Sequence, residues 1–308
     1  MDDILAIRDS IARAFQGSSK AIDRLLCCVL AGGHLLLEDV PGVGKTVLAS
    51  AAARSIGGEF RRVQMTSDQL PADVIGVSVF DSGSGGFRFI PGPVFANVVI
   101  ADEINRAPPR TQSALLEAMN ENAVSVDGVS HRLPSPFLVV ATQNPADHIG
   151  AFPLPESQLD RFLIKTAIGY PDAATEVKVL LDGGGVDAVR SIEPAVALDR
   201  VREMQAATNA TTLAVPLAEY IQALAERSRR FDELDAGLST RGALALASVA
   251  RANARLHDRD YVTTDDIVEH FAEVVAHRFI LRDDSQAGSE QVRRDLAAAM
   301  LRDVPMPV

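Results

Sequence analysis

The sequence predicts an α/β fold in which an open sheet, built around a phosphate-binding loop, is followed by an all-helical second half. Three observations lead to this prediction. An apolar strand, a glycine-rich turn and a helix follow one another over residues 34–53. Further short apolar segments before residue 170 have the length and composition of strands. From Asp172 onward the sequence has almost no strand pattern.

The composition limits the kinds of protein that this chain can be. Its 308 residues are enough for two domains, and 41 acidic against 30 basic residues give a net charge of -11. This charge gives no general support for binding nucleic acid or anionic membranes, although a local basic patch stays open. The acidic start, Met1-Asp2-Asp3, is unlike a signal peptide, and the longest apolar run, residues 25–37, is too short to cross a bilayer. Since the adjacent Cys27 and Cys28 are expected to be buried and unpaired, we expect a soluble, cytoplasmic protein without membrane insertion.

The first segment, residues 3–31, predicts two helices because its apolar residues recur at helical spacing on either side of Gly17-Ser18-Ser19. Two interpretations stay open for it. The segment can form a wall of a nucleotide-base pocket, or it can serve core packing alone.

The glycine-rich turn after the strand at residues 34–37 has the chemistry of a phosphate-binding loop. Gly42 and Gly44 allow positive φ and a close approach of backbone N–H groups, and the helix that follows adds its N-terminal dipole. Lys45 can reach the β- and γ-phosphates, and the Thr46 hydroxyl can ligate Mg²⁺. Asp39 stands where the general pattern has a glycine. The candidate phosphate-binding residues are Asp39, Val40, Pro41, Gly42, Val43, Gly44, Lys45, Thr46 and Val47.

A second candidate site lies at the end of the apolar segment 98–101, which runs into Asp102 and Glu103. A strand that ends in two acids places them at the carboxyl edge of an α/β sheet, where ligands bind. We expect Asp102 to hold Mg²⁺ through water and Glu103 to act as general base towards the attacking water.

The remaining segments of the first half complete the sheet. Strands are expected at residues 60–65, 137–142 and 163–168, a helix at 111–122, a helical turn at 154–161, and a hairpin at 124–130 that turns at Asp127-Gly128. Residues 70–93 are glycine-rich and irregular, and alternating Phe87 and Phe89 predict a short hairpin or a helix-flanked insertion. Asn144 follows a strand, where it can orient a lytic water or simply form an Asn-Pro turn.

The second half predicts helices separated by a flexible break at Gly183-Gly184-Gly185. They are expected over residues 173–182, 198–207, 216–229, 240–256, 264–278 and 288–302.

Five segments, in this order, resemble those of the MoxR family of AAA+ ATPases over nearly the whole chain. They are the nucleotide loop at residues 37–46, the Walker B region at 89–107, the sensor 1 segment at 141–145, the arginine-finger segment at 153–162 and the sensor 2 segment at 238–242. The family accepts Asp39 in its loop, and the Ser239-Thr240-Arg241 of this chain stands where Ser-Pro-Arg is frequent.

The resemblance implies a fold and its domains. It implies a P-loop NTPase core with a parallel sheet in strand order 5-1-4-3-2, forming an αβα nucleotide-binding domain at residues 1–170, and a C-terminal all-α lid domain at 171–308. It also implies a helix 2 insertion at residues 70–92 and a hairpin before sensor 1 at 123–134, which face the pore of a ring or a client.

The resemblance further implies a mechanism and partners. ATP or ADP and Mg²⁺ would be the cofactors. Asn144 would act beside both anchors as sensor 1, Arg161 would enter the site of a neighbouring subunit as arginine finger, and Arg241 would reach the γ-phosphate of its own subunit as sensor 2. The chain would form a homo-oligomeric, hexameric ring. It would remodel or mature a client complex, including metal or cofactor insertion, together with a separate protein that has a von Willebrand factor A domain.

Three alternatives compete with this function. A motor subunit of a chelatase-like assembly belongs to the closest related clade. A nucleic-acid motor has the acidic balance against it. A nucleotide-gated switch without turnover is disfavoured because a non-hydrolysing switch is expected to have lost one of the candidate active-site residues. These are all present: Lys45, Asp102, Glu103, Asn144 and Arg161.

Overall fold

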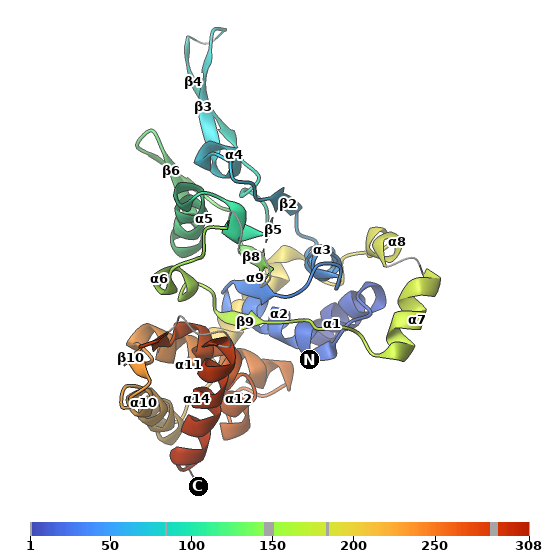
Figure 1. Ribbon diagram of the computed structural model, residues 1–308. Coiled ribbons are helices and arrows are strands. Elements are labelled where there is room, and N and C mark those ends of the chain that lie inside the picture. Colours follow the sequence, from blue (N-terminus) through green and yellow to red (C-terminus); the bar gives the residue numbers. More distant parts are fainter. Residues whose placement is uncertain (1, 84, 145–150, 183–184, 284–288, 308) are drawn as a thin grey trace.

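The computed structural model describes all residues except 1, 84, 145–150, 183–184, 284–288 and 308 (Figure 1). Its central sheet has five parallel strands in the order β2-β5-β8-β1-β9. These strands are β1 (Leu35–Glu38), β2 (Phe60–Gln64), β5 (Val98–Asp102), β8 (Leu138–Gln143) and β9 (Ile164–Thr166). Numbered among themselves they have the order 5-1-4-3-2, so the predicted sheet is confirmed.

The middle strands are apolar along their length because helices cover both faces of the sheet. Leu35, Leu36 and Leu37 of β1 are fully buried, and the first four residues of β5 are too. The helix α3 (Lys45–Ser55) begins directly after the glycine-rich loop and buries its alanine-rich face. The carboxyl ends of β1, β5 and β8 therefore meet at one edge of the sheet, together with the loop.

Two hairpins extend from the sheet side of the molecule, as the sequence predicts. The first consists of β3 (Gly76–Asp81) and β4 (Gly86–Pro91) after the short helix α4 (Pro71–Ile75), and it projects far from the body (Figure 1). The second consists of β6 (Ala123–Val126) and β7 (Val129–Arg132) after α5 (Pro109–Glu121). It turns at Asp127 and Gly128, whose φ values are 51° and 77°. A stacked contact between Phe89 and His131, with ring centroids 3.9 Å apart, joins the two hairpins.

The second half is helical. In Figure 1 the helices after residue 210 lie below the sheet, whereas Ala173–Asp182 and Val186–Arg190 lie to the side, near the N-terminal helix and the helix after the glycine-rich loop. Its helices are α7 (Ala173–Asp182), α8 (Val186–Arg190), α9 (Leu198–Asn209), α10 (Val215–Ser228), α11 (Thr240–Leu256), α12 (Thr264–Val268), α13 (Phe271–Val275), η2 (Ala276–Arg278) and α14 (Ser289–Asp303). The single helix predicted at 264–278 is wrong, because the chain breaks at His270, whose buried ring lies 3.2 Å from Asn253 Oδ1. The short helix α8 and the short pair β10 (Leu234–Ala236) and β11 (Ile280–Leu281) were not expected.

The N-terminal helices α1 (Asp2–Ala14) and α2 (Ser19–Ala31) belong to the same hydrophobic core as the lid helices. Leu25 of α2 and Leu246 of α11 are both fully buried in it. Arg24 of α2 donates to Thr166 of β9 and forms an ion pair with Glu273 of α13. The helix α2 thus joins the sheet to the lid, and the division of the chain at residue 170 stays a prediction. No helix in the described part of the chain is both long and apolar enough to cross a membrane.

Candidate active site

The phosphate-binding loop has the backbone that its glycines predict. Gly42 and Gly44 have φ values of 88° and 89°, which side chains other than glycine rarely adopt. Gly44 precedes the first residue of α3, Lys45, so the loop delivers free backbone N–H groups and the positive end of the helix dipole to one place. The backbone N–H groups and the helix dipole of such a turn can bind an anion without any help from side chains.

A cleft of about 400 Å³ opens beside the loop. It is lined by Pro41, Gly42, Gly44, Lys45, Thr46, Val47, Arg62, Gln64, Asp102, Glu103, Thr142, Gln143 and Asn144. The predicted loop lysine, both predicted acids and Asn144 therefore meet in one cleft. Its polar lining and its position at the carboxyl edge of the sheet suit a charged ligand.

Lys45 is held at the floor of this cleft by backbone oxygens. Its Nζ donates to the carbonyl of Asp39 and, at 3.4 Å, to the carbonyl of Gln143. Partial burial lowers the pKa of Lys45, and the surrounding carboxylates, among them Asp102 and Glu103, oppose this shift. A bound polyphosphate would give the ammonium a stronger, charged acceptor than these carbonyls.

The Asp39 side chain does not face the cleft. It is only 8% exposed and accepts three backbone N–H groups, from Val40 at 2.8 Å and from Ile168 and Gly169 at 2.7 Å each. The carboxylate thus ties the loop to the segment that follows β9. A loop with glycine at this position, as in the general pattern, would lack this tie, which is the physical contribution of Asp39 to the loop.

The two acids at the end of β5 are held by one hydroxyl group. Thr142 Oγ1 donates to Asp102 Oδ1 at 2.6 Å and accepts the backbone N–H of Glu103 at 2.9 Å. Glu103 has a left-handed backbone with φ of 57°, which costs about 1–2 kcal/mol for a residue with a side chain. The hydroxyl of Thr142 helps to keep this strained backbone in place.

Two side chains from β2, together with Arg106, bind the carboxylates of Asp102 and Glu103. Arg62 forms an ion pair with Asp102 Oδ2 at 2.6 Å, and Gln64 donates to Glu103 Oε2 at 3.1 Å. Arg106 approaches the same Glu103 oxygen at 3.2 Å. The sequence reasoning missed Arg62, Gln64 and Thr142. A signal exists for the first two, because polar residues alternate along a strand that lies beside the Asp-Glu strand once the strand order is known.

The donor set fits a magnesium ion that is held mainly by a nucleotide. Thr46 and Asp102 both line the cleft and supply one hydroxyl and one carboxylate. Among the described residues no group of three or more acidic, histidine or cysteine side chains could hold a metal by itself. Magnesium in nucleotide sites typically has one or two protein ligands, with phosphate oxygens and water completing the octahedron.

A second hollow, on the other side of the loop, is lined by the end of α1. Residues 14–17 face Gly42, Val43 and Ile168 there. The apolar face of α1, with Ile7 and Ile11, is buried in the core. The leading segment therefore packs in the core, as one of the two interpretations has it, and it also lines a hollow beside the phosphate loop; its role as the wall of a nucleotide-base pocket stays a prediction.

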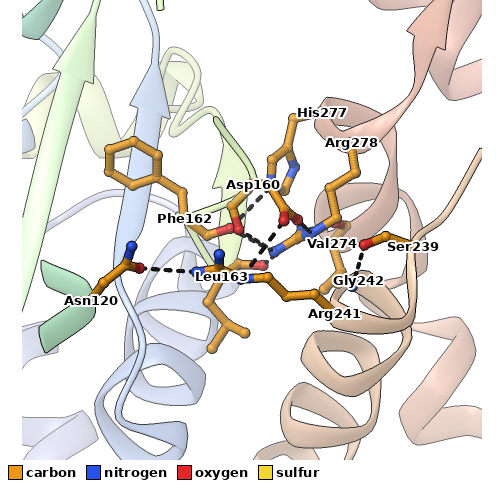
Figure 2. Close-up of polar contacts among 10 residues, drawn as sticks. All are labelled: Asn120, Asp160, Phe162, Leu163, Ser239, Arg241, Gly242, Val274, His277 and Arg278. Atoms are coloured by element: carbon orange, nitrogen blue, oxygen red, sulfur yellow. Dashed lines mark hydrogen bonds and ion pairs between the residues drawn. The ribbon is translucent and has the colours of Figure 1, made fainter. Parts of the chain in front are cut away.

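The predicted arginines lie outside the cleft. Neither Arg161 nor Arg241 is among the described residues that line it. Arg241 instead donates to Asn120 Oδ1 at 2.9 Å and pairs with Asp160 Oδ2 at 3.7 Å (Figure 2). In this conformation the sensor 2 candidate is thus bound next to the arginine-finger segment and not in the cleft of its own chain, and its role as sensor 2 stays a prediction.

Comparisons with known proteins agree with this geometry. Residues 34–164 match the family described as "ATPase family associated with various cellular activities (AAA)", and residues 226–297 match the AAA lid domain. Uncharacterized protein YeaC of Bacillus subtilis (strain 168) is 41% identical over 295 residues, which are 95% of this chain and 92% of the relative. Chaperone MoxR1 of Mycobacterium tuberculosis is 40% identical over 287 residues, which are 90% of this chain and 75% of the relative.

Two further matches extend over nearly the full length. Protein MoxR of Methylorubrum extorquens is 33% identical over an alignment of 321 positions, which covers 96% of this chain and 93% of the relative. A crystal structure of a protein from Cytophaga hutchinsonii that is assigned as an ATPase superposes with a TM-score of 0.89 at 35% identity, and the match covers 99% of this chain and 95% of that chain.

Proposed function

Since the chain belongs to the MoxR family of AAA+ ATPases, we propose that it uses Mg²⁺-dependent ATP hydrolysis to remodel or mature a partner protein complex. The convergence of the phosphate loop, the Asp102-Glu103 pair and Asn144 in one cleft supports this proposal. Chaperone MoxR1 of Mycobacterium tuberculosis, a relative along most of the chain, carries the name of a chaperone.

Each group in the cleft has its own role in the proposed hydrolysis. The loop N–H groups and Lys45 would bind the phosphates, and Thr46 and Asp102 would hold Mg²⁺, which would neutralise charge on the phosphate oxygens. Glu103 takes the proton of the attacking water, and Asn144 orients that water. Thr142 keeps Asp102 and Glu103 in register through its single hydroxyl group.

The working enzyme is a ring, hexameric as in other AAA+ proteins, in which each cleft borrows an arginine from its neighbour. Arg161 is outside the cleft of its own chain, so it is available to a neighbouring one. A separate protein with a von Willebrand factor A domain presents the client, and insertion of a metal or cofactor is one form of maturation that such a machine drives. The apolar side chains on the projecting first hairpin, Phe80 and Phe87, are 58% and 77% exposed and could contact a client.

A nucleotide-gated switch is the second candidate. One observation favours it, because the carboxylate of Glu103 is engaged by Gln64 and Arg106 and would have to leave these partners to act as base.

Steady-state ATP hydrolysis per subunit, measured over a range of protein concentrations with and without Mg²⁺, tests the proposal. We expect the rate to rise cooperatively with concentration. Glu103→Gln should bind ATP but lose about 10²–10⁴ in rate, and Arg161→Ala about 10³–10⁵. Glu121→Gln, at the end of α5, and Arg282→Ala, in a surface ion pair with Asp235, are the matched controls. A Glu103→Gln variant that turns over like the wild type would refute the role of Glu103 as general base, and ATP binding by the wild type without any turnover would favour the switch.

A further inference from the structure

One buried lid arginine, Arg278, binds the backbone of Asp160 and of Phe162 (Figure 2), the residues directly before and after Arg161 in the sequence. Arg278, the last residue of η2, donates to the carbonyl of Asp160 at 3.4 Å, of Phe162 at 2.8 Å and of Leu163 at 3.4 Å. Its Nε also donates to Asp160 Oδ1 at 2.8 Å. The residues immediately before and after the candidate arginine finger are therefore fixed by a single side chain from the lid.

The guanidinium of Arg278 is buried, and each of its nitrogen atoms donates a hydrogen bond. The Arg278 side chain is 4% exposed, and a further donation goes to the carbonyl of Val274 in its own segment. Burial lowers the pKa of Arg278 to about 10, against the opposing effect of Asp160, so the guanidinium stays charged at neutral pH. A buried cation of this kind holds its geometry strictly, because any displacement leaves charge and carbonyls unpaired.

The candidate sensor 2 segment meets the same carboxylate. Asp160 pairs with Arg278 through one oxygen and with Arg241, at the start of α11, through the other. Gly242 lets α11 approach closely, since a Cβ there would lie 3.0 Å from Arg278 Cδ and 2.4 Å from Leu238 Cδ1. Two lid elements, η2 and the N-terminus of α11, thus converge on the residue that precedes Arg161.

We propose that Asp160 and Arg278 are positioning residues for Arg161. Through these two residues, the lid of one subunit fixes the position of the arginine that acts in the cleft of the neighbouring subunit. The proposal rests on the ring ATPase proposed above. Because η2 packs on α6 (Glu156–Leu159) and Arg278 binds the carbonyls that follow it, a rotation of the lid must carry the finger segment with it. If Arg241 acts as sensor 2, it adds a dependence on nucleotide, because its guanidinium would leave Asp160 when it binds a γ-phosphate.

Mixed rings separate this role from a merely structural one. Asp160→Asn keeps the size of the side chain and removes the charge, and Arg278→Lys keeps the charge and removes the planar fork. Each is purified alone and also mixed in equal amounts with Glu103→Gln subunits, which have a dead cleft but an intact finger. The mixture of Arg161→Ala with Glu103→Gln is the reference for a shared site. Arg282→Met is the matched lid control, because Arg282 forms an exposed ion pair away from the finger segment.

For Asp160→Asn alone we expect kcat to fall about 10- to 100-fold with little change in KM, the size of loss that follows a displacement of about 1 Å in a catalytic group. In the mixture the rate should rise, although half of the subunits cannot hydrolyse ATP. Half of the clefts can hydrolyse ATP, and half of these have a neighbouring subunit whose Arg161 is correctly positioned. Random mixing therefore gives about a quarter of the wild-type rate. Arg278→Lys should behave in the same way, and Arg282→Met should match the wild type.

Each contrary result has a distinct meaning. If the Asp160→Asn mixture gives half the rate of Asp160→Asn alone, the residue acts on its own cleft and the positioning role is overturned. If Arg161→Ala recovers in the mixture while Asp160→Asn and Arg278→Lys do not, the shared site stands and this inference fails. If Arg161→Ala itself does not recover, the ring mechanism of the proposed function fails. Recovery in a mixture also shows that the variant subunit is folded, because its own cleft then does the work.

Discussion

Replacement of Asp39 by asparagine tests whether the unexpected acid in the phosphate loop is a structural tie. The wild-type carboxylate accepts the N–H of Val40 on one oxygen, and those of Ile168 and Gly169 on the other. An asparagine of the same shape has only one carbonyl oxygen. If this oxygen serves Ile168 and Gly169, the amide NH₂ must face the N–H of Val40, and a donor then meets a donor.

The magnitude follows from the count of hydrogen bonds. Hydrogen bonds to a charged group contribute about 1.5–3 kcal/mol each, and neutral ones about 1 kcal/mol. Asp39→Asn loses one charge-assisted bond and weakens two others, so we expect the free energy of unfolding to fall by about 2–4 kcal/mol. The affinity for ATP should fall as well, because the loop loses its anchor to the segment after β9.

Urea unfolding near neutral pH measures the first effect, and Asp172→Asn is the matched control. Asp172 also accepts a backbone N–H, that of Thr175 at 2.7 Å, but it is exposed, and asparagine caps a helix about as well as aspartate. The control should therefore cost a few tenths of a kcal/mol. An Asp39→Asn variant that is no less stable than Asp172→Asn would refute the tie, and the reason for an acid at this position would have to be sought in nucleotide contact.

Three further changes have defined outcomes. Burial lowers the pKa of His34 from 6.5 to about 4, so the folded protein favours the neutral ring, and this contribution to stability is complete above pH 6.5. The free energy of unfolding should fall by on the order of 3 kcal/mol as the pH drops from 6.5 to 4. His34→Gln should flatten this part of the pH profile measured by urea unfolding. Gly76→Ala should destabilise by about 2–4 kcal/mol, because Gly76 has φ of 101° and a Cβ would lie 2.5 Å from a backbone oxygen, whereas Gly86→Ala, with open space around it, should cost little in the same unfolding assay. Thr142→Val should lower kcat about 10- to 100-fold and leave the Kd for ATP nearly unchanged, since it frees Asp102 and Glu103 without altering the phosphate loop; an unchanged kcat would remove Thr142 from the mechanism.

The sequence was sufficient where local chemistry decides the structure. The positive φ values at Gly42 and Gly44, the turn at Asp127 and the five strands of the sheet all follow from glycine placement and apolar periodicity. Periodicity failed where it continues through a break, as at His270, because a buried polar ring and its partner Asn253 override the local preference.

Contacts between distant side chains could not be read from patterns. Arg278 and Asp160 are 118 residues apart, and nothing near either one indicates the other. The same holds for Arg62 and Asp102, whose pairing depends on the register of β2 against β5. The resemblance to a family places motifs in order along the chain, but the partner of each charged side chain is set by packing in three dimensions.

The edge strand β9 is where these separate contacts act on one another. Arg278 binds the carbonyls of Phe162 and Leu163 just before β9, and Asp39 binds the N–H groups of Ile168 and Gly169 just after it. In the middle of the strand, the ammonium of Lys165 pairs with Glu38 of β1 at 2.7 Å and with Glu290 of α14 at 2.9 Å.

The strand has three residues and, at about 3.3 Å per residue, a length of about 10 Å. An extended strand that is hydrogen-bonded to its neighbour has no slack with which to absorb a displacement at one end. A shift of the nucleotide loop that pulls on Asp39 is therefore opposed at the other end by Arg278, and it is relieved only if the lid moves too. We therefore expect the loop, the lid and the segment of Arg161 to change position together, which is the coupling that the proposed sharing of Arg161 between subunits requires.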